Sequence, residues 1–102
     1  AASQEFPVVL DRRSGLGLCI DADPRNGRTL VVHAVRQGGL FDLWNRSHPS
    51  LAVLPGDHIV SANGIHGDAK SLYSECLKPQ VLTLVLQRPA PPRDREAVHH
   101  GQ

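Results

Sequence analysis

Short apolar runs, each bounded by residues that favour turns, dominate the hydrophobic pattern of this chain. The runs have the length of β-strands, are rich in Val, Leu and Ile, and in places alternate apolar with polar positions. Proline at position 7 places the first run at a sheet edge or near a strand start, where a missing N–H does least harm. The predicted strands are 5–10, 16–22, 29–35, 58–62 and 81–86.

Two further segments have a helical pattern. After Asp68, a suitable N-cap, apolar residues recur at 69, 72, 73, 76 and 77, the spacing of an amphipathic helix that ends near Pro79. A short helix or turn is predicted over 40–44, followed by an irregular stretch to residue 54. Because strands and helices do not alternate regularly, the pattern predicts a mainly β (α+β) fold of about five or six strands.

Length and composition narrow the possible functions. A chain of 102 residues suits one domain. The net charge of +1 and the aromatic content of 4% provide neither the basic surface nor the stacking platform for nucleic acid, so we expect no such partner. No apolar run approaches the roughly 20 residues of a membrane-spanning helix. We therefore expect a soluble or peripheral protein without a transmembrane segment.

The two ends of the chain differ in composition from its middle. Residues 89–102 are rich in proline and charge, which predicts a tail outside the folded domain. Residues 1–4 are predicted to be a short N-terminal extension. The domain itself is therefore predicted to span residues 5–88.

Cys19 and Cys76 are the cysteines of the chain, and both fall within apolar patterns. Free cysteine behaves as a small hydrophobe and is commonly buried. We therefore expect two buried free thiols. This favours a reducing compartment, such as the cytoplasm or the interior of an organelle like the plastid.

The most informative loop is Ser14-Gly15-Leu16-Gly17-Leu18-Cys19-Ile20. Two glycines separated by one residue let the backbone turn sharply and leave amide N–H groups pointing outward, where they can hold an anion. Leu16, Leu18 and Ile20 alternate along the following strand and would form an apolar wall beside that anion. The combination suits the carboxylate and last apolar side chain of a protein C-terminus. A Gly-x-Gly loop is also common as a tight turn without a ligand.

Four motifs, in this order, resemble those of the PDZ family. They are Gly15-Leu16-Gly17-Leu18, Val32-x-x-Val35-x-x-Gly38-Gly39, Pro55-Gly56-Asp57-His58-Ile59 and Asn63-Gly64, and the resemblance covers about residues 5 to 88. It implies a PDZ-like, partly open antiparallel sandwich or barrel capped by two short helices. The strand order resembles that of eukaryotic PDZ domains. Trp-Asn, His-Pro and Gly-Asp pairs at 44, 48 and 67 make the chain look like PDZ-type domains of unicellular algae.

The resemblance also implies where a ligand binds. A peptide adds as an antiparallel strand between the second strand and the second helix, with its carboxylate on the amides of Leu16, Gly17 and Leu18. The pocket for the last side chain is formed by Leu16, Leu18, Ile20 and, on the helix, Leu77. The other expected groove residues are Cys19, Lys70, Tyr73 and Ser74.

Two positions depart from the family's pattern. The basic residue that usually stands four places before the first loop glycine is replaced by Asp11. Arg12 or Arg13 could substitute for it only if the turn is shaped differently. Lys70 stands at the helix start, where many PDZ domains have a histidine that binds a serine or threonine hydroxyl. The class of peptide therefore stays open.

The sequence gives little support for a metal site or for catalysis. The six histidines form no Cys-x-x-Cys or His-x-x-x-His pairing, so we expect no metal site and no cofactor. Cys19 with His33 or His58 is the one nucleophile and base arrangement worth naming, yet nothing nearby should activate the thiol. We therefore expect no enzymatic activity.

Two functions are consistent with these observations. The first is a protein interaction module that binds a peptide C-terminus or an internal β-strand by β-augmentation. The second is a structural or peripheral subunit of a larger assembly, such as an organellar membrane complex of the photosynthetic type. In that case the segment Trp44 to Pro49 and the tail would contact other subunits. Trp44 fits either role, as an anchor for a partner or as a cap on its own core.

Overall fold

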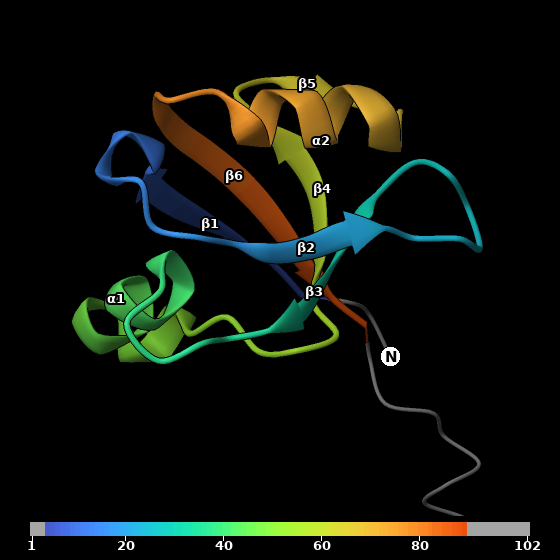
Figure 1. Ribbon diagram of the computed structural model, residues 1–102. Helices are drawn as coiled ribbons and strands as arrows, with labels where there is room; N and C mark the ends of the chain where they lie inside the picture. The colour runs from blue at the N-terminus through green and yellow to red at the C-terminus, as the bar shows by residue number, and fades with distance from the viewer. Residues whose placement is uncertain (1–3, 90–102) are drawn as a thin grey trace, which may run out of the picture.

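Six strands form one antiparallel sheet in the computed structural model, which describes residues 4–89 (Figure 1). Their order is β1-β6-β4-β3-β2, with β5 paired to β4 beside this path, so β1 and β2 are the sheet edges. The strands are β1 Gln4–Asp11, β2 Cys19–Ala22, β3 Leu30–Ala34, β4 His58–Ala62, β5 Ile65–His66 and β6 Val81–Arg88. The predicted mainly β (α+β) class with antiparallel strands is confirmed.

Alternation along β1 and β6 builds the centre of the core. Every second residue of β1 from Phe6 onward is buried, and β6 buries Leu82, Leu84 and Leu86. Phe6 lies opposite Leu86, and Leu10 lies opposite Leu82. The apolar faces of the two strands therefore coincide, which fixes their register.

Two α-helices, α1 Leu40–Ser47 and α2 Ala69–Leu77, cover the sheet. In Figure 1, α2 crosses the top of the sheet above β2, and α1 lies at the lower left. The Asp68 carboxylate accepts from the Ser71 amide at 3.0 Å and so caps α2 where the sequence predicted a cap. Short 3-10 helices follow β1 and α1: they are η1 Arg12–Ser14 and η2 Pro49–Leu51.

A buried ion pair fixes the end of β6. Asp57 is 2% exposed and accepts from Arg88 Nε and Nη2 at 2.9 and 2.7 Å and from the Leu54 amide at 2.9 Å. Arg88 also donates to the Ala52 carbonyl at 2.7 Å and lies 5.0 Å from the centre of the Phe6 ring. The buried carboxylate thus has three donors, which offset the loss of its hydration.

Several element boundaries differ from the sequence prediction. The strand predicted over 16–22 pairs with β3 only from Cys19, because the backbone of the preceding residues bonds to η1 and α1 instead. The helix predicted over 40–44 continues to Ser47, and the last strand continues to Arg88, which pairs with Gln4. The two-residue strand β5 is too short to produce a sequence pattern.

The two cysteines differ in burial. Both are free thiols, and Cys76 is buried as predicted, but Cys19 is only half-buried. Leu18 and Ile20 pack against the core, so Cys19 lies on the opposite face of β2. There its sulfur accepts a hydrogen bond from Arg36 Nε at 2.8 Å.

Within residues 4–89, no helix is long and apolar enough to cross a membrane. Of the predicted N-terminal extension 1–4, Gln4 belongs to β1 instead, and residues 1–3 lie outside the described residues, as do residues 90–102 of the predicted tail 89–102.

Candidate functional site

The loop between η1 and β2 is held by short contacts within itself. Gly15 ends η1 in a left-handed conformation, with φ of 80°, which glycine adopts without strain. The Leu16 amide donates to Ser14 Oγ at 3.2 Å, and the Leu16 carbonyl accepts from Arg12 Nη1 at 2.6 Å. The loop is therefore positioned without any ligand.

Of the three amides predicted to hold the carboxylate, that of Leu16 is bonded to Ser14 Oγ, and two remain available. Within residues 4–89, the N–H groups of Gly17 and Leu18 have no hydrogen-bond acceptor. The Gly17 carbonyl is fixed from the opposite side by the Leu40 amide at 3.4 Å. A Cβ built on Gly17 would meet no heavy atom within 4 Å, so the space around it is open. Adjacent free N–H groups of this kind can bind an anion.

The two neighbouring arginines have different roles. Arg13 forms an ion pair with Asp11 at 2.9 Å, and its hydrogen bonds hold the pKa of Asp11 below the usual value. Arg12 turns toward the loop, and its Nε is buried without a partner in the described part of the chain. The 3-10 turn η1 separates the two side chains in this way. The charge beside the free amides is therefore that of Arg12.

Apolar side chains lie next to the loop. Leu16, Leu18 and Ile20 are partly buried and pack against the core. Leu77 is 52% exposed, whereas its neighbour Cys76 is fully buried. Burial raises the pKa of Cys76 to about 11, so the thiol stays protonated near neutral pH and acts as an apolar group.

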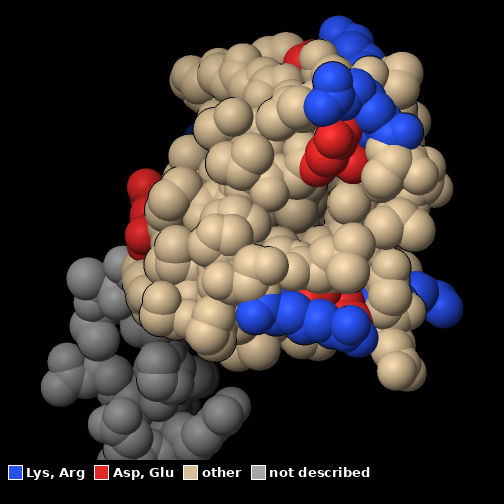
Figure 2. Space-filling model, turned by 90° about the vertical axis from the view of Figure 1, so that its left-hand side faces the viewer, with Lys and Arg blue, Asp and Glu red and all other residues tan. Residues whose placement is uncertain are grey.

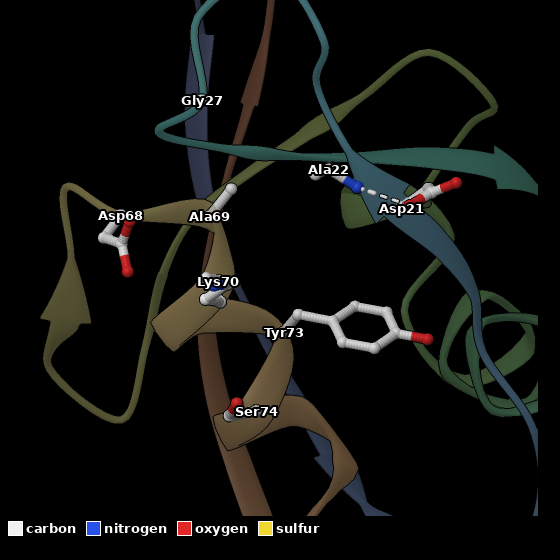
Figure 3. Close-up of a pocket in the computed structure, with 8 residues that line it drawn as sticks. All are labelled: Asp21, Ala22, Gly27, Asp68, Ala69, Lys70, Tyr73 and Ser74. Atoms are coloured by element: carbon white, nitrogen blue, oxygen red, sulfur yellow. Dashed lines mark hydrogen bonds between the residues drawn. The ribbon is translucent and has the colours of Figure 1, made fainter.

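A pocket of about 400 Å³ lies between β2 and α2 (Figure 3). The ring of Tyr73 extends from α2 toward β2, whereas Asp21 points away from the helix. The Ala69 amide donates to the Gly27 carbonyl at 3.0 Å and so joins the β2–β3 hairpin loop to the helix start. The lining residues are Asp21, Ala22, Gly27, Asp68, Ala69, Lys70, Tyr73 and Ser74.

The residues predicted for the site fall into separate groups. Lys70, Tyr73 and Ser74 line the pocket between β2 and α2. Arg13 is paired with Asp11 and is directed away from the loop amides. The structure brings together at the loop Arg12, Leu16, Gly17 and Leu18.

Sequence reasoning missed several residues of the pocket. Asp21 and Ala22 continue the strand beyond Ile20, and extending the groove along the strand would have found them. Asp68 was recognised only as a helix cap. Gly27 carries no sequence signal for this role, because its contact with α2 depends on how the hairpin loop folds back.

A second hollow, of about 280 Å³, lies between β1 and α1. Val9 and Leu43 at its wall are 48% and 43% exposed. Trp44 packs against the core, donates its indole N–H to the Leu51 carbonyl at 2.9 Å and stacks on the His48 ring. Trp44 thus caps its own core, one of its two predicted roles. On this side of the molecule, charged side chains gather mainly in two groups separated by uncharged surface (Figure 2).

The histidines named as candidate bases face carboxylates. His33 Nε2 lies 3.8 Å from Asp21, and His58 Nε2 lies 3.5 Å from Asp23. Across residues 4–89, no group of three or more His, Cys, Asp or Glu side chains could hold a metal ion. The histidine pair at 99 and 100 lies outside the described residues.

Comparison with solved structures identifies the fold. The crystal structure of MUPP1 PDZ4 matches with a TM-score of 0.64 at 18% sequence identity, over 90% of this chain and 82% of that chain. No family model matches the sequence, and none of the curated proteins does. The chain has the PDZ fold that its sequence motifs predicted.

Proposed function

We propose that this chain is an interaction module that binds the C-terminus of a partner protein as an additional strand between β2 and α2. One observation carries the proposal: the amides of Gly17 and Leu18 are free, in a loop whose Leu16 carbonyl binds the Arg12 guanidinium. Because a fold by itself does not define a function, the PDZ fold supports the proposal only together with this site.

The loop would bind the terminal carboxylate. Its oxygens would accept hydrogen bonds from the Gly17 and Leu18 amides, close to the positive charge of Arg12. Hydrogen bonds to a charged group contribute about 1.5–3 kcal/mol, more than neutral ones. A free C-terminus would thereby be preferred over an internal segment.

The edge strand β2 would bind the main chain of the peptide. An edge strand presents unpaired N–H and C=O groups that a guest strand can use. The last side chain would enter the apolar space at Leu16, Leu18 and Ile20. Burying a Val or Leu side chain there contributes about 1.5–3 kcal/mol. Residues further upstream would reach the pocket at Lys70 and Tyr73.

The proposed activity is binding without catalysis. Strand addition requires only backbone donors and acceptors, so it needs no cofactor. The thiol of Cys76 is protonated and buried, and Cys19 accepts a hydrogen bond from Arg36 instead of contacting a base. The buried Cys76 therefore lacks the activated environment of a nucleophile.

Fluorescence polarisation with a library of short labelled peptides tests this proposal. We expect free-acid peptides that end in Val, Leu or Ile to bind in the micromolar range. The same peptides with a C-terminal carboxamide should bind at least about tenfold more weakly, because one charge-assisted bond is lost. If no free-acid peptide binds to the chain while circular dichroism shows it folded, the proposal is wrong.

The hollow between β1 and α1 favours a second candidate function, that of a structural subunit docked on a larger assembly. Exposed Val9 and Leu43 provide apolar contact area on a side of the molecule with little charge at its centre (Figure 2). Size-exclusion chromatography of a native extract tests this role. The wild-type chain should elute with high-mass complexes and Leu43→Asp as a free chain. If both elute as free chains, this second function is excluded.

A further inference from the structure

The positive charges that the fold leaves unpaired suggest which peptides this site selects. Arg12, Arg28, Arg36 and Lys70 are the cations of residues 4–89 without an ion-pair partner. Arg28 lies in the hairpin loop beyond β2, and Lys70 shares its pocket with Asp68. Arg12 and Arg36 both lie close to the loop that precedes β2. Arg12 donates to the Leu16 carbonyl, and Arg36 donates to the sulfur of Cys19, the first residue of β2.

The geometry of strand addition places Arg36 next to a defined position of the peptide. This step rests on the proposed function. Side chains of a guest strand alternate between the two faces of the sheet, as those of β2 do. If the terminal residue lies beside Leu18 and faces the groove, the penultimate residue lies beside Cys19 and faces outward. The residue two positions earlier lies beside Asp21, also on the outer face.

The charge on the outer face of β2 changes from positive to negative along the strand. Near the loop, the exposed Arg36 is held over Cys19 by the Nε–Sγ hydrogen bond of 2.8 Å. Two residues further along, the Asp21 side chain is 71% exposed, with His33 Nε2 at 3.8 Å. Figure 3 shows Asp21 pointing away from α2, as this face requires. A guest strand would therefore meet a positive charge first and a negative charge second, counted back from its C-terminus.

We infer that this chain selects C-termini with an acidic penultimate residue and a basic residue two positions before it. A Glu or Asp side chain beside Cys19 would form an ion pair with Arg36, which would exchange its bond to the sulfur for one to the carboxylate. A Lys or Arg side chain beside Asp21 would pair with that carboxylate. Arg36 is thus the specificity-determining residue at the penultimate position.

Two peptides of identical composition test the inference. The matched peptide carries Lys fourth from the end and Glu in the penultimate position, before a C-terminal Val. The swapped peptide exchanges Lys and Glu and keeps the same net charge. One exposed ion pair changes an affinity up to roughly fivefold. With both contacts reversed, we expect the matched peptide to bind roughly tenfold more tightly, and the ratio to shrink in high salt.

Variants of the chain distinguish the contact between Arg36 and the penultimate residue from a general electrostatic attraction between chain and peptide. Arg36→Gln should reduce the ratio between the two affinities several-fold. Arg28→Gln removes the same charge from the hairpin loop and should leave the ratio unchanged. The double variant Asp21→Lys with Arg36→Glu should reverse the preference. All of these side chains are exposed, so we expect every variant to fold, which circular dichroism checks.

Three results would overturn the inference. If wild type binds both peptides equally and binds their carboxamide forms poorly, the inferred selection by peptide charge is wrong, whereas the proposed carboxylate site is supported. If Arg28→Gln lowers the ratio as much as Arg36→Gln, the effect is general electrostatics. If neither peptide binds at all, the proposed function itself fails, and the inference fails with it.

Discussion

Two arginines in this molecule use their positive charge in opposite ways. Arg88 donates to both oxygens of Asp57 and to the Ala52 carbonyl, and all of these contacts are within the fold. The Arg12 guanidinium donates to one carbonyl, that of Leu16, and its Nε is buried without a partner among residues 4–89. Buried polar groups are normally satisfied, so an unsatisfied one requires an explanation. The free amides of Gly17 and Leu18 lie in the loop that Arg12 holds, and we propose that a ligand binds to them.

Arg88 is expected to contribute to the stability of the fold, and Arg12 to peptide binding. Removing one member of a buried ion pair leaves an uncompensated charge and destabilises the fold. Removing a donor that has no partner in the free protein costs little, because its desolvation is relieved at the same time. Substitutions at the two ends of the molecule should therefore affect different measurements.

The largest effect is expected for Arg88→Met. Asp57 would remain as a buried carboxylate without its counterion, which should lower the free energy of unfolding by about 3 kcal/mol. Urea denaturation measures this change. Peptide affinity, corrected for the folded fraction, should not change. A loss below about 1 kcal/mol would show that the pair contributes no more than an exposed one.

Gly17→Val should act on binding alone. Gly17 is not in a left-handed conformation, and its Cβ position is empty, so the free energy of unfolding should change by less than about 0.5 kcal/mol. The added side chain would occupy the space in front of the amides and weaken peptide binding at least about tenfold, or 1.4 kcal/mol. Unchanged affinity in isothermal titration calorimetry would place the carboxylate elsewhere.

Gly15→Ala is the matched control for that variant. Gly15 also has empty space at its Cβ position, but its φ of 80° is unfavourable for alanine. We expect a loss of stability of about 1 kcal/mol, with affinity per folded molecule retained.

Arg12→Met should have a smaller effect on affinity and should lower the free energy of unfolding by no more than about 1 kcal/mol, because the bond from Nη1 to the Leu16 carbonyl is lost together with the desolvated Nε. The peptide carboxylate would lose the nearby charge, and we expect about fivefold weaker binding, or 1 kcal/mol. Arg13→Met is the control, because Arg13 is already paired with Asp11 and exposed. If the two variants weaken binding equally, the attraction is a general surface effect and Arg12 has no special position.

The smallest effect is expected in the dependence of stability on acid pH. It tests Glu75, another charged residue whose contacts lie within the fold. Hydrogen bonds from Lys78, then Gln80 and Asn63, hold the pKa of Glu75 below its usual value of 4.5. This carboxylate therefore adds stability above about pH 4.5, and that contribution is lost as pH falls through its lower pKa in the folded state. Glu75→Gln should flatten part of the acid dependence of the urea midpoint. An identical pH profile for wild type and variant would contradict this assignment.

The fold could be predicted from the sequence largely because its signals are local. The apolar runs, the cap at Asp68 and the turns each depend on neighbouring residues. The start of β2 could not be predicted in the same way. Residues 16–18 alternate like a strand, yet contacts from Arg12 and Leu40 hold them out of the sheet. Likewise, α1 is longer than predicted, and the Asn45 side chain in its extension bonds to the distant backbone of Val53.

The site could be predicted only in part. The paired glycines located the loop, because their effect on the backbone is intrinsic. Which arginine accompanies the loop depends on the geometry of η1, which places Arg12 inward and pairs Arg13 with Asp11. The contact of the hairpin loop with α2 through Gly27 depends on tertiary packing and has no counterpart in the local sequence.

Proton–nitrogen correlation NMR of the chain, titrated with a peptide that ends in Val, tests the central claim most directly. On addition of the free-acid peptide, the amide protons of Gly17 and Leu18 should move downfield more than any others, because each gains a charged acceptor. The carboxamide form of the same peptide should leave these two resonances almost unchanged. If the free acid binds without moving them, or if both forms move them equally, the loop does not bind the carboxylate and the proposed binding mode is wrong.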